Sequence, residues 1–294
     1  MTTNGPLGGQ ARQFGLIGYP VGHSLSPAMH NAAFAHQRMN CHYAAYAVAP
    51  DMLQPAVAGM RALGILGMNV TIPHKEAVIP LLDEVAPTAR QAGAVNTIVN
   101  RGGKLVGYNT DGWGFLCSLE EAGVKLPGLQ VVVLGAGGAA RAIALHLGLS
   151  RVARVIISNR TATRAEALAG EIQALVPEVP ISAVEARSPE ERAALIDAGL
   201  VVNCTSLGMK GDNVGGTPVS DINLLPQKAV VYDTVYTPAE TRLLKEARLR
   251  GLRTVGGLGM LIHQGACAWE YWFGRRGPVP VMAGAARAAL EGES

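Results

Sequence analysis

One stretch, residues 130–164, limits what this chain can fold into more than any other. Within it, residues 131–134 are all apolar and predict a short buried strand, and the sequence GAGGAA then leads into an Ala-rich helix. The pattern is G-x-G-x-x-A between a strand and a helix, which is typical of a dinucleotide-binding unit. Gly135 permits the tight turn, Gly137 lets a pyrophosphate approach the backbone, and Ala140 allows close helix packing. Amide groups at the start of the helix would hold the phosphates.

The end of the second predicted strand, residues 154–158, indicates which dinucleotide binds. An NAD site carries an acidic residue about 20 positions on, which accepts hydrogen bonds from the ribose 2′-hydroxyl. This chain has Asn159-Arg160-Thr161 there, and Arg164 follows. Guanidinium groups form charge-assisted bonds with a 2′-phosphate, whereas a carboxylate would repel it. The site therefore predicts NADP; the alternative is that the two arginines are solvated charges at the start of a helix.

Length and composition fit an α/β enzyme of two domains and argue against several other classes. The chain has 294 residues, of which 49% are apolar and 16% charged, and its net charge is +3. With four Phe and no run of Lys or Arg, nothing supports a nucleic-acid platform. No apolar stretch reaches the roughly 18 residues of a membrane span. Residues 1–13 are polar and Gly-rich, so we expect a loose leader instead of a signal peptide, and a cytoplasmic location.

The first part of the chain alternates between strand-like and helix-like segments up to about residue 111. The expected strands are 14–18, 43–48, 66–70, 95–99 and 104–108, and the expected helices are 27–38, 52–63 and 75–82. Residues 101–103 predict a hairpin turn between the last two strands. Such alternation predicts a mainly parallel sheet with helices on its faces and one antiparallel strand at the hairpin.

The second part begins with a helix at 113–122, and strand-like segments recur after it. They are 131–134, 154–158, 181–184, 200–203, 229–232 and 252–255. Six strands is the count of a doubly wound dinucleotide-binding fold. Because that fold is then complete, we expect the last helices, 260–273 and 281–290, to return to the first unit.

The sequence therefore predicts an α/β protein with two domains. Residues 1–112, joined by 259–294, would form a substrate-binding catalytic domain with a mainly parallel sheet. Residues 113–258 would form a Rossmann-type NADP-binding domain.

Polar residues gather at the predicted strand ends of the first domain. Ser24 and Ser26 could bind a carboxylate or a polyol, although Ser26 before Pro27 is also a good helix N-cap. Lys75 stands at the expected start of a helix, where an ammonium opposes the helix dipole unless an anion compensates it. A solvated surface lysine is the alternative for this position.

Two further segments, 93–97 and 107–114, contribute Asn96 and Asp111. Asp111 could equally cap the helix expected at residue 113. Since the carboxyl ends of parallel strands collect ligands at one edge of a sheet, these groups predict a polar cleft. Such a cleft suits a hydroxylated substrate that faces a nicotinamide.

These segments and the motifs 159–161, 203–209, 233–236 and 256–264 resemble the shikimate dehydrogenase family. The resemblance covers nearly the whole chain, from residue 14 to about residue 273, with many motifs in the same order. It implies the reversible, NADP-dependent interconversion of 3-dehydroshikimate and shikimate in aromatic amino-acid biosynthesis.

The resemblance also implies roles for particular residues. Ser24 and Ser26 would hold the substrate carboxylate. The ring substituents would be bound by Thr71, Lys75, Asn96, Asp111, Tyr236 and Gln264. The cofactor would be contacted by Gly135, Ala136, Gly137, Gly138, Ala139, Asn159, Arg160, Thr161, Arg164, Thr234 and Gly257.

The catalytic pair implied by the resemblance is Lys75 with Asp111. Oxidation of a secondary alcohol releases a proton that a group within hydrogen-bond reach must accept. A carboxylate beside Lys75 stabilises the ammonium, which suits proton donation to a ketone in the reductive direction. The alternative is that Lys75 acts mainly as a hydrogen-bond donor that stabilises the alkoxide.

Several points stay open at the level of sequence. His23, His30 and His74 show no metal-ligand spacing, so we expect no metal. A quinate or broader shikimate-type dehydrogenase is an alternative, and so is a non-catalytic NADP(H) sensor, against which Lys75 and Asp111 together argue. The strictness for NADP and the oligomeric state, for which a homodimer is one option, are not decided.

Overall fold

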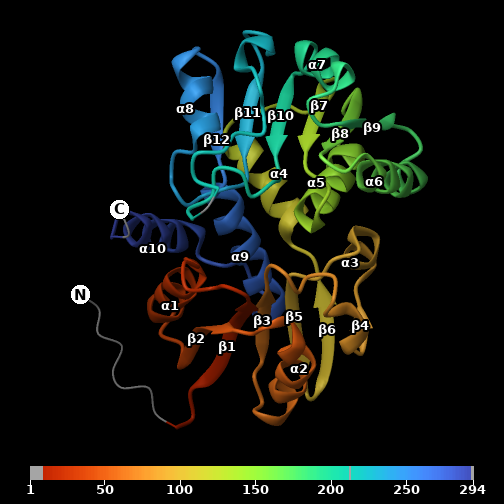
Figure 1. Ribbon diagram of the computed structural model, residues 1–294. Coiled ribbons are helices and arrows are strands. Elements are labelled where there is room, and N and C mark those ends of the chain that lie inside the picture. Colours follow the sequence, from red (N-terminus) through yellow and green to blue (C-terminus); the bar gives the residue numbers. More distant parts are fainter. Residues whose placement is uncertain (1–8, 212, 293–294) are drawn as a thin grey trace. The chain divides into compact units, whose positions relative to one another are not determined.

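The computed structural model describes residues 9–211 and 213–292, and the chain forms two α/β units (Figure 1). One unit is Met1–Gly114 with Ile262–Ser294, and the other is Phe115–Leu261. The chain passes from the first unit to the second within helix α4 (Asp111–Glu121) and returns within helix α9 (Leu258–Phe273). The sequence prediction put these changes after residues 112 and 258.

The first unit contains a mixed sheet with the strand order β2-β1-β3-β5-β6-β4. Its strands are β1 (Arg12–Gly18), β2 (Cys41–Ala47), β3 (Gly67–Val70), β4 (Glu84–Val85), β5 (Thr97–Arg101) and β6 (Lys104–Tyr108). Strands β1, β2 and β3 are parallel, whereas β5 runs antiparallel to β3 and β6. The expected hairpin is therefore β5–β6.

Helices cover the two faces of this sheet with different chemistry. They are α1 (Ser26–His36), α2 (Leu53–Ala62), α3 (Pro87–Ala92) and the second part of α9, and α10 (Val279–Gly292) packs against α1. Leu53 and Val57 of α2 pack in an aliphatic cluster with Ile17 of β1. Phe14, on the alternate side of β1, lies 5.4 Å from the Phe34 ring of α1 and 5.1 Å from Phe273 of α9. Residues from the end of the chain thus complete this core.

The second unit is a doubly wound fold with the strand order β12-β11-β10-β7-β8-β9, all parallel. Its strands are β7 (Gln130–Leu134), β8 (Arg154–Asn159), β9 (Ile181–Glu185), β10 (Leu200–Asn203), β11 (Val230–Asp233) and β12 (Arg253–Gly256). Its helices after α4 are α5 (Gly138–Leu149), α6 (Ala162–Leu175), α7 (Pro189–Ile196) and α8 (Arg242–Leu249). The predicted α/β class with a Rossmann-type unit is confirmed.

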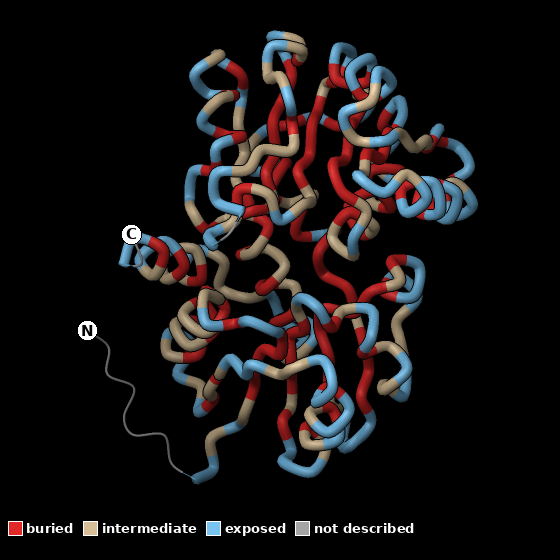
Figure 2. The backbone as a smooth tube through the Cα atoms, viewed as in Figure 1, coloured by how far each residue is buried: buried red, intermediate tan, exposed pale blue. Residues whose placement is uncertain are grey.

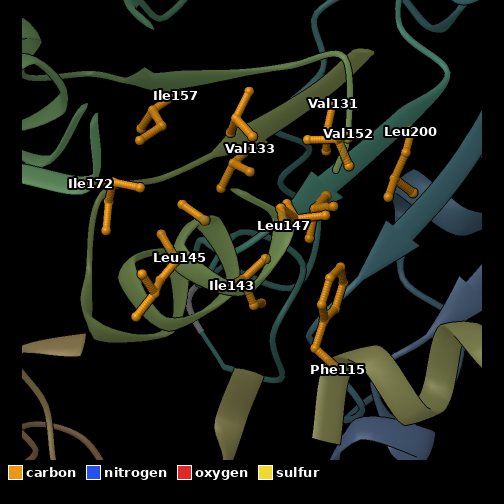
Figure 3. Packing of buried hydrophobic residues seen from close by; sticks show 14 of the residues in the cluster. Phe115, Val131, Val133, Ile143, Leu145, Leu147, Val152, Ile157, Ile172 and Leu200 are labelled. Atoms are coloured by element: carbon orange, nitrogen blue, oxygen red, sulfur yellow. The ribbon is translucent and has the colours of Figure 1, made fainter. Parts of the chain in front are cut away.

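Strand β7 shows why the central strands of this unit are continuously apolar. Val131 and Val133 pack in a cluster with residues of α4, α5 and α6 (Figure 3). Val132 and Leu134 face the opposite cluster, which contains residues of α7 and α8. Because neighbouring residues of a strand point to opposite faces, a strand covered on both sides must be apolar throughout. Figure 2 accordingly shows buried backbone along the central strands of this sheet.

The helix predicted over residues 75–82 is wrong. The segment contains turns and one short 3-10 helix, Ile79–Leu81. Pro80 lacks an N–H and disfavours helical geometry at the residue before it, so no α-helix can continue through this point. Lys75 therefore stands on a turn after β3, and the argument from a helix dipole does not apply to it.

Arg12 and Gln13, which were expected to belong to a loose leader over residues 1–13, lie in β1. Residues 1–8 of it lie outside the described residues. Among the helices of the described ranges, none combines the length and the apolar character needed to cross a membrane.

His30 is a titratable side chain enclosed in the first unit. Its ring is fully buried in α1 and stacks on Tyr43, with ring centroids 4.5 Å apart. Neither ring nitrogen has a hydrogen-bond partner among the described residues. Burial lowers the pKa of His30 from 6.5 to about 3, because a charged ring would lose its hydration.

We expect His30 to make the protein less stable in mild acid. The folded chain keeps the ring neutral, while the unfolded chain binds a proton as the pH falls through its ordinary value. Stability is therefore full above that value and is lost as the pH falls toward the folded-state pKa. Relative to His30→Phe, the free energy of unfolding of the wild type should fall by about 1 kcal/mol between pH 6 and pH 5 in urea titrations. His36→Phe, at an exposed position of the same helix, should show no such difference.

Candidate active site

An ion pair between Lys75 and Asp111 is the centre of the candidate site in the first unit. Lys75 Nζ lies 2.7 Å from Asp111 Oδ2, and the two side chains are 19% and 6% exposed. Lys75 stands on the turn after β3, where its carbonyl accepts a 2.8 Å hydrogen bond from Val95 N. Asp111 is the first residue of α4. Two segments 36 residues apart are thereby joined at their polar groups.

Asn96 holds the other oxygen of the carboxylate. Its Nδ2 donates to Asp111 Oδ1 at 2.8 Å and to Thr110 Oγ1 at 2.9 Å. Its Oδ1 accepts from Thr110 N at 2.9 Å, and Asp111 N donates to Asn109 Oδ1 at 3.0 Å. Both carboxylate oxygens thus have donors, so the carboxylate cannot rotate without breaking hydrogen bonds.

Gln264 of α9 joins the same network. Its Oε1 lies 3.3 Å from Thr110 Oγ1 and 3.4 Å from Asn96 Nδ2. Four of the residues proposed from the sequence therefore form one cluster, namely Lys75, Asn96, Asp111 and Gln264. Their hydrogen bonds show that Asn96 also orients the carboxylate, in addition to its implied role toward the substrate.

Sequence reasoning did not single out three residues that build this network: Asn69, Asn109 and Thr110. Asn69 is buried in β3 and donates to Asn96 O and Thr97 Oγ1, both at 3.1 Å. A signal was present, because an Asn inside the buried strand Gly67–Val70 needs partners for its polar atoms.

The structure joins Ser24 to Ser26 and corrects one expectation about them. Ser26 N donates to Ser24 Oγ at 3.3 Å. Ser26 is the first residue of α1 and not its N-cap, which is Leu25, and no side chain caps this helix. The N-cap explanation for Ser26 is therefore wrong. Within the described residues, no hydrogen bond links this pair to the Lys75 cluster, and Thr71 follows β3 with its N–H bonded to Ile17 O at 2.9 Å.

The dinucleotide turn of the second unit has the geometry that phosphate binding requires. Gly135 adopts a φ of 110°, in the region open to glycine, and its N–H donates to Ser158 O at 2.7 Å. A Cβ on Gly137 would meet no atom within 4 Å, so this surface is open to a ligand. Gly138 begins α5, whose first turn has no acidic residue. The turn, with Ala136 and Ala139, fits a pyrophosphate on the helix dipole.

The loop after β8 presents the predicted 2′-phosphate residues. Asn159 Nδ2 donates to Thr161 O at 3.0 Å, which folds the loop onto itself before α6. Arg160 and Arg164 are exposed. Within residues 9–211 and 213–292 neither guanidinium forms an ion pair. Both are therefore available to an anion.

The buried carboxylate of Asp233, at the carboxyl end of β11, binds the neighbouring loops by hydrogen bonds. Asp233 accepts hydrogen bonds from Asn203 Nδ2 at 2.9 Å, Val235 N at 3.0 Å and Thr241 Oγ1 at 2.6 Å. Burial raises the pKa of the Asp233 carboxyl, and the three donors oppose that effect. The network shapes the loop that carries Thr234 and Tyr236. Tyr236 belongs to the second unit, whereas the other implied substrate residues belong to the first.

Gly257 lies against this loop. A Cβ at Gly257 would be 2.2 Å from Thr234 O and 3.0 Å from Asp233 O, so only glycine fits beside the backbone. Thr234 and Gly257, both implied to contact the cofactor, are thus neighbours at the carboxyl edge of the sheet.

No group of three or more His, Cys, Asp or Glu side chains that could hold a metal occurs in the described part of the chain. The absence of a metal stays a prediction from the sequence. The groups of the first-unit site can exchange protons and form hydrogen bonds with a ligand, and the second unit has a nucleotide-binding fold.

Comparisons with known proteins agree across the chain. Residues 16–98 match the shikimate dehydrogenase substrate binding domain, residues 119–202 match shikimate / quinate 5-dehydrogenase, and residues 257–287 match the shikimate 5'-dehydrogenase C-terminal domain. A curated shikimate dehydrogenase (NADP(+)) of Symbiobacterium thermophilum is 65% identical over 285 residues, which cover 97% of each chain.

Solved structures agree with the sequence matches. A shikimate dehydrogenase in complex with NADP+ has a TM-score of 0.88 at 41% identity, over 96% of this chain and 97% of that one. The Thermus thermophilus enzyme in complex with NADP(H) and shikimate has a TM-score of 0.85 at 39% identity, over 95% and 100%.

The doubly wound unit with its glycine turn, and the lysine–carboxylate site of the other unit, define a dinucleotide-dependent oxidoreductase. Within that class, the chain belongs to the shikimate dehydrogenase family. The resemblance inferred from the sequence motifs is confirmed.

We expect Gly257→Ala to disrupt the cofactor side of the second unit. The added methyl group would overlap the Thr234 carbonyl, so the loop must shift, and the free energy of unfolding should fall by about 1–3 kcal/mol. NADP binding, measured by calorimetry, should weaken as well. Gly256→Ala is the matched control, because its Cβ would have ordinary contacts, the nearest at 3.7 Å. Equal behaviour of the two variants would contradict the prediction.

Proposed function

We propose that the chain catalyses the NADP-dependent, reversible reduction of 3-dehydroshikimate to shikimate, a step of aromatic amino-acid biosynthesis. The observation that carries the proposal is the Lys75–Asp111 pair at 2.7 Å in a chain that is 65% identical to a shikimate dehydrogenase (NADP(+)). Residues 1–112 with 259–294 would form the substrate domain, and residues 113–258 the NADP domain.

The second unit has residues suited to each part of NADP. The turn from Gly135 to Ala139 would hold the pyrophosphate, and Arg160 and Arg164 the 2′-phosphate, with Asn159 and Thr161 shaping their loop. Thr234 and Gly257 would border the nicotinamide half, which binds beyond β10 and β11 in this fold. When bound, NADPH supplies the hydride of the reaction.

The first unit would bind the substrate and move the proton. Ser24 and Ser26 would hold its carboxylate, and Thr71, Asn96 and Gln264 its hydroxyl groups, with Tyr236 supplied by the second unit. Lys75 would donate a proton to the oxygen of the ketone during reduction, because Asp111 stabilises its ammonium form. In the oxidative direction, Lys75 would stabilise the alkoxide as a hydrogen-bond donor.

A substrate panel tests this function directly. Purified protein would be mixed with shikimate or quinate and with NADP or NAD, and the nicotinamide absorbance followed. We expect the fastest turnover with shikimate and NADP. The match to a shikimate / quinate family description makes quinate the second candidate, and faster turnover of quinate would favour it. Binding of NADP without turnover of either substrate would favour a sensor.

Replacement of the lysine tests the assignment of the proton. We expect Lys75→Ala to lower kcat by about 10²–10⁴-fold with little change in the KM for shikimate, since general acid–base groups contribute on that scale. Lys104→Ala is the control, because Lys104 forms an exposed ion pair with Glu84 in the same unit. A raised KM with kcat intact would make Lys75 a binding residue only. Thermal unfolding shows whether the variant keeps its fold.

The setting of the enzyme is also part of the proposal. We propose a cytoplasmic location, in keeping with a small cyclic hydroxy acid as the substrate. A homodimer is the assembly that the sequence leaves as an option, and sedimentation would decide it.

A further inference from the structure

We propose that Arg187 is a third contact for the cofactor 2′-phosphate, next to Arg160 and Arg164, and that buried Glu191 positions it. The inference rests on the proposed NADP-dependent function. It extends the 2′-phosphate site from the loop after β8 to the loop after β9. Arg187 follows β9, whereas the other two arginines follow β8, so the anion would be held from two adjacent loops.

Glu191 is a buried carboxylate with one partner in β8 and one on the loop after β9. It is 2% exposed, and its Oε1 accepts a 2.5 Å hydrogen bond from Ser158 Oγ. Its Oε2 accepts a 2.6 Å hydrogen bond from Arg187 N. Ser158 in turn accepts from Gly135 N through its carbonyl, at 2.7 Å. The Glu191 carboxylate therefore links the backbone of Arg187 to Ser158, and Ser158 supports the dinucleotide turn through Gly135 N.

The backbone of Arg187 adopts an unusual conformation at this position. Its φ is 66°, in the left-handed region that a non-glycine residue enters only when its surroundings compensate the strain. The hydrogen bond from its N–H to Glu191 supplies such compensation. Strained residues held in this way are concentrated at ligand sites.

The neighbouring strand register places Arg187 beside the 2′-phosphate loop. Asn159 of β8 pairs with Glu185 of β9, and Ala186 N donates to Asn159 O at 3.1 Å. Adjacent strands lie about 4.8 Å apart, and this register sets Ala186 opposite Arg160, so Arg187 is one residue beyond the position opposite Arg160. Arg187 is exposed, as is Arg160. Both long side chains thus start from the same corner of the carboxyl edge.

The charges of the corner favour an anion as the ligand. Over the described residues, none of the three arginines forms an ion pair. Glu185 and Glu190 are exposed acidic residues near Arg187 in the sequence, yet neither pairs with it. A guanidinium without a carboxylate partner is suited to bidentate phosphate binding.

Helix capping explains only part of the arrangement. Glu191 N donates to Ser188 Oγ at 3.1 Å, which is the N-terminal cap of α7. In a capping box the Glu side chain returns to the N-cap residue itself, here Ser188. In this chain it accepts hydrogen bonds from Arg187 N and Ser158 Oγ instead, so the carboxylate links β8 to the loop after β9 and does not complete the capping box.

Binding of adenosine 2′,5′-bisphosphate and of AMP, measured by calorimetry, tests the proposal without catalysis. The dissociation constant of AMP divided by that of the bisphosphate reports how much the 2′-phosphate contributes to binding. We expect Arg187→Gln to reduce this ratio about three- to tenfold, as Arg160→Gln should, because a charge-assisted bond is lost at an exposed site. Arg154→Gln removes the same charge at the amino end of β8 and should leave the ratio unchanged.

A second variant tests the role of Glu191. Glu191→Gln should reduce the ratio while AMP binding is retained, and it should have no further effect when Arg187 is already replaced, because both changes remove one interaction. A full effect of Glu191→Gln in the Arg187→Gln background would overturn the positioning role. Weakened AMP binding would show a general disturbance of the fold and would likewise overturn it.

The outcomes also separate this inference from the proposed function. If the wild type bound both nucleotides equally, the NADP assignment itself would fail. If the wild type preferred the bisphosphate and Arg187→Gln kept that preference in full, only the third contact would be refuted.

Discussion

The polar cluster of the first unit depends on one requirement: a nearly buried carboxylate must have a donor for each of its oxygens. Asp111 meets it with Lys75 on one oxygen and Asn96 on the other. An unpaired charge in this place would be costly, because it would have left water without compensation. The same bonds that remove this cost bring together the turn after β3, the segment before β5, the start of α4 and, through Gln264, helix α9. The contacts that stabilise the buried carboxylate therefore also fix the positions of Lys75 and Asn96.

In the second unit, glycines that allow the backbone to approach closely hold the loops together, whereas in the first unit polar side chains do so. Gly135 permits a turn that a Cβ would crowd against Cys204 and Thr205, and Gly257 lets two loops touch at the Thr234 carbonyl. The buried carboxylates Asp233 and Glu191 then fix the loops on either half of the sheet edge. Each loop that would meet the dinucleotide is thus braced from inside the protein.

Much of the fold could be predicted from the sequence, because its strongest signals are local. The apolar run of β7 followed by GAGGAA required a strand, a tight turn and a helix, and the six-strand count followed from the strand-like apolar segments that recur after it. The helix at 75–82 could not be excluded by apolar spacing, since a single Pro80 decided against it. The ion pair of Lys75 with Asp111 was suggested by motifs, but the supporting roles of Asn69 and Thr110 depend on tertiary contacts. The carboxylate of Glu191 is a similar case, because its partners are 33 and 4 residues away.

The discontinuous first unit has a consequence for how the chain is made. Phe14 and Phe34, from its beginning, pack on Trp269, Trp272 and Phe273 from near its end. On a ribosome, the second unit can acquire its whole core as soon as residue 261 has emerged. The aromatic side of the first sheet lacks these partners until residue 273 has also emerged. The segment synthesised first therefore completes its core only after the second unit can complete its own.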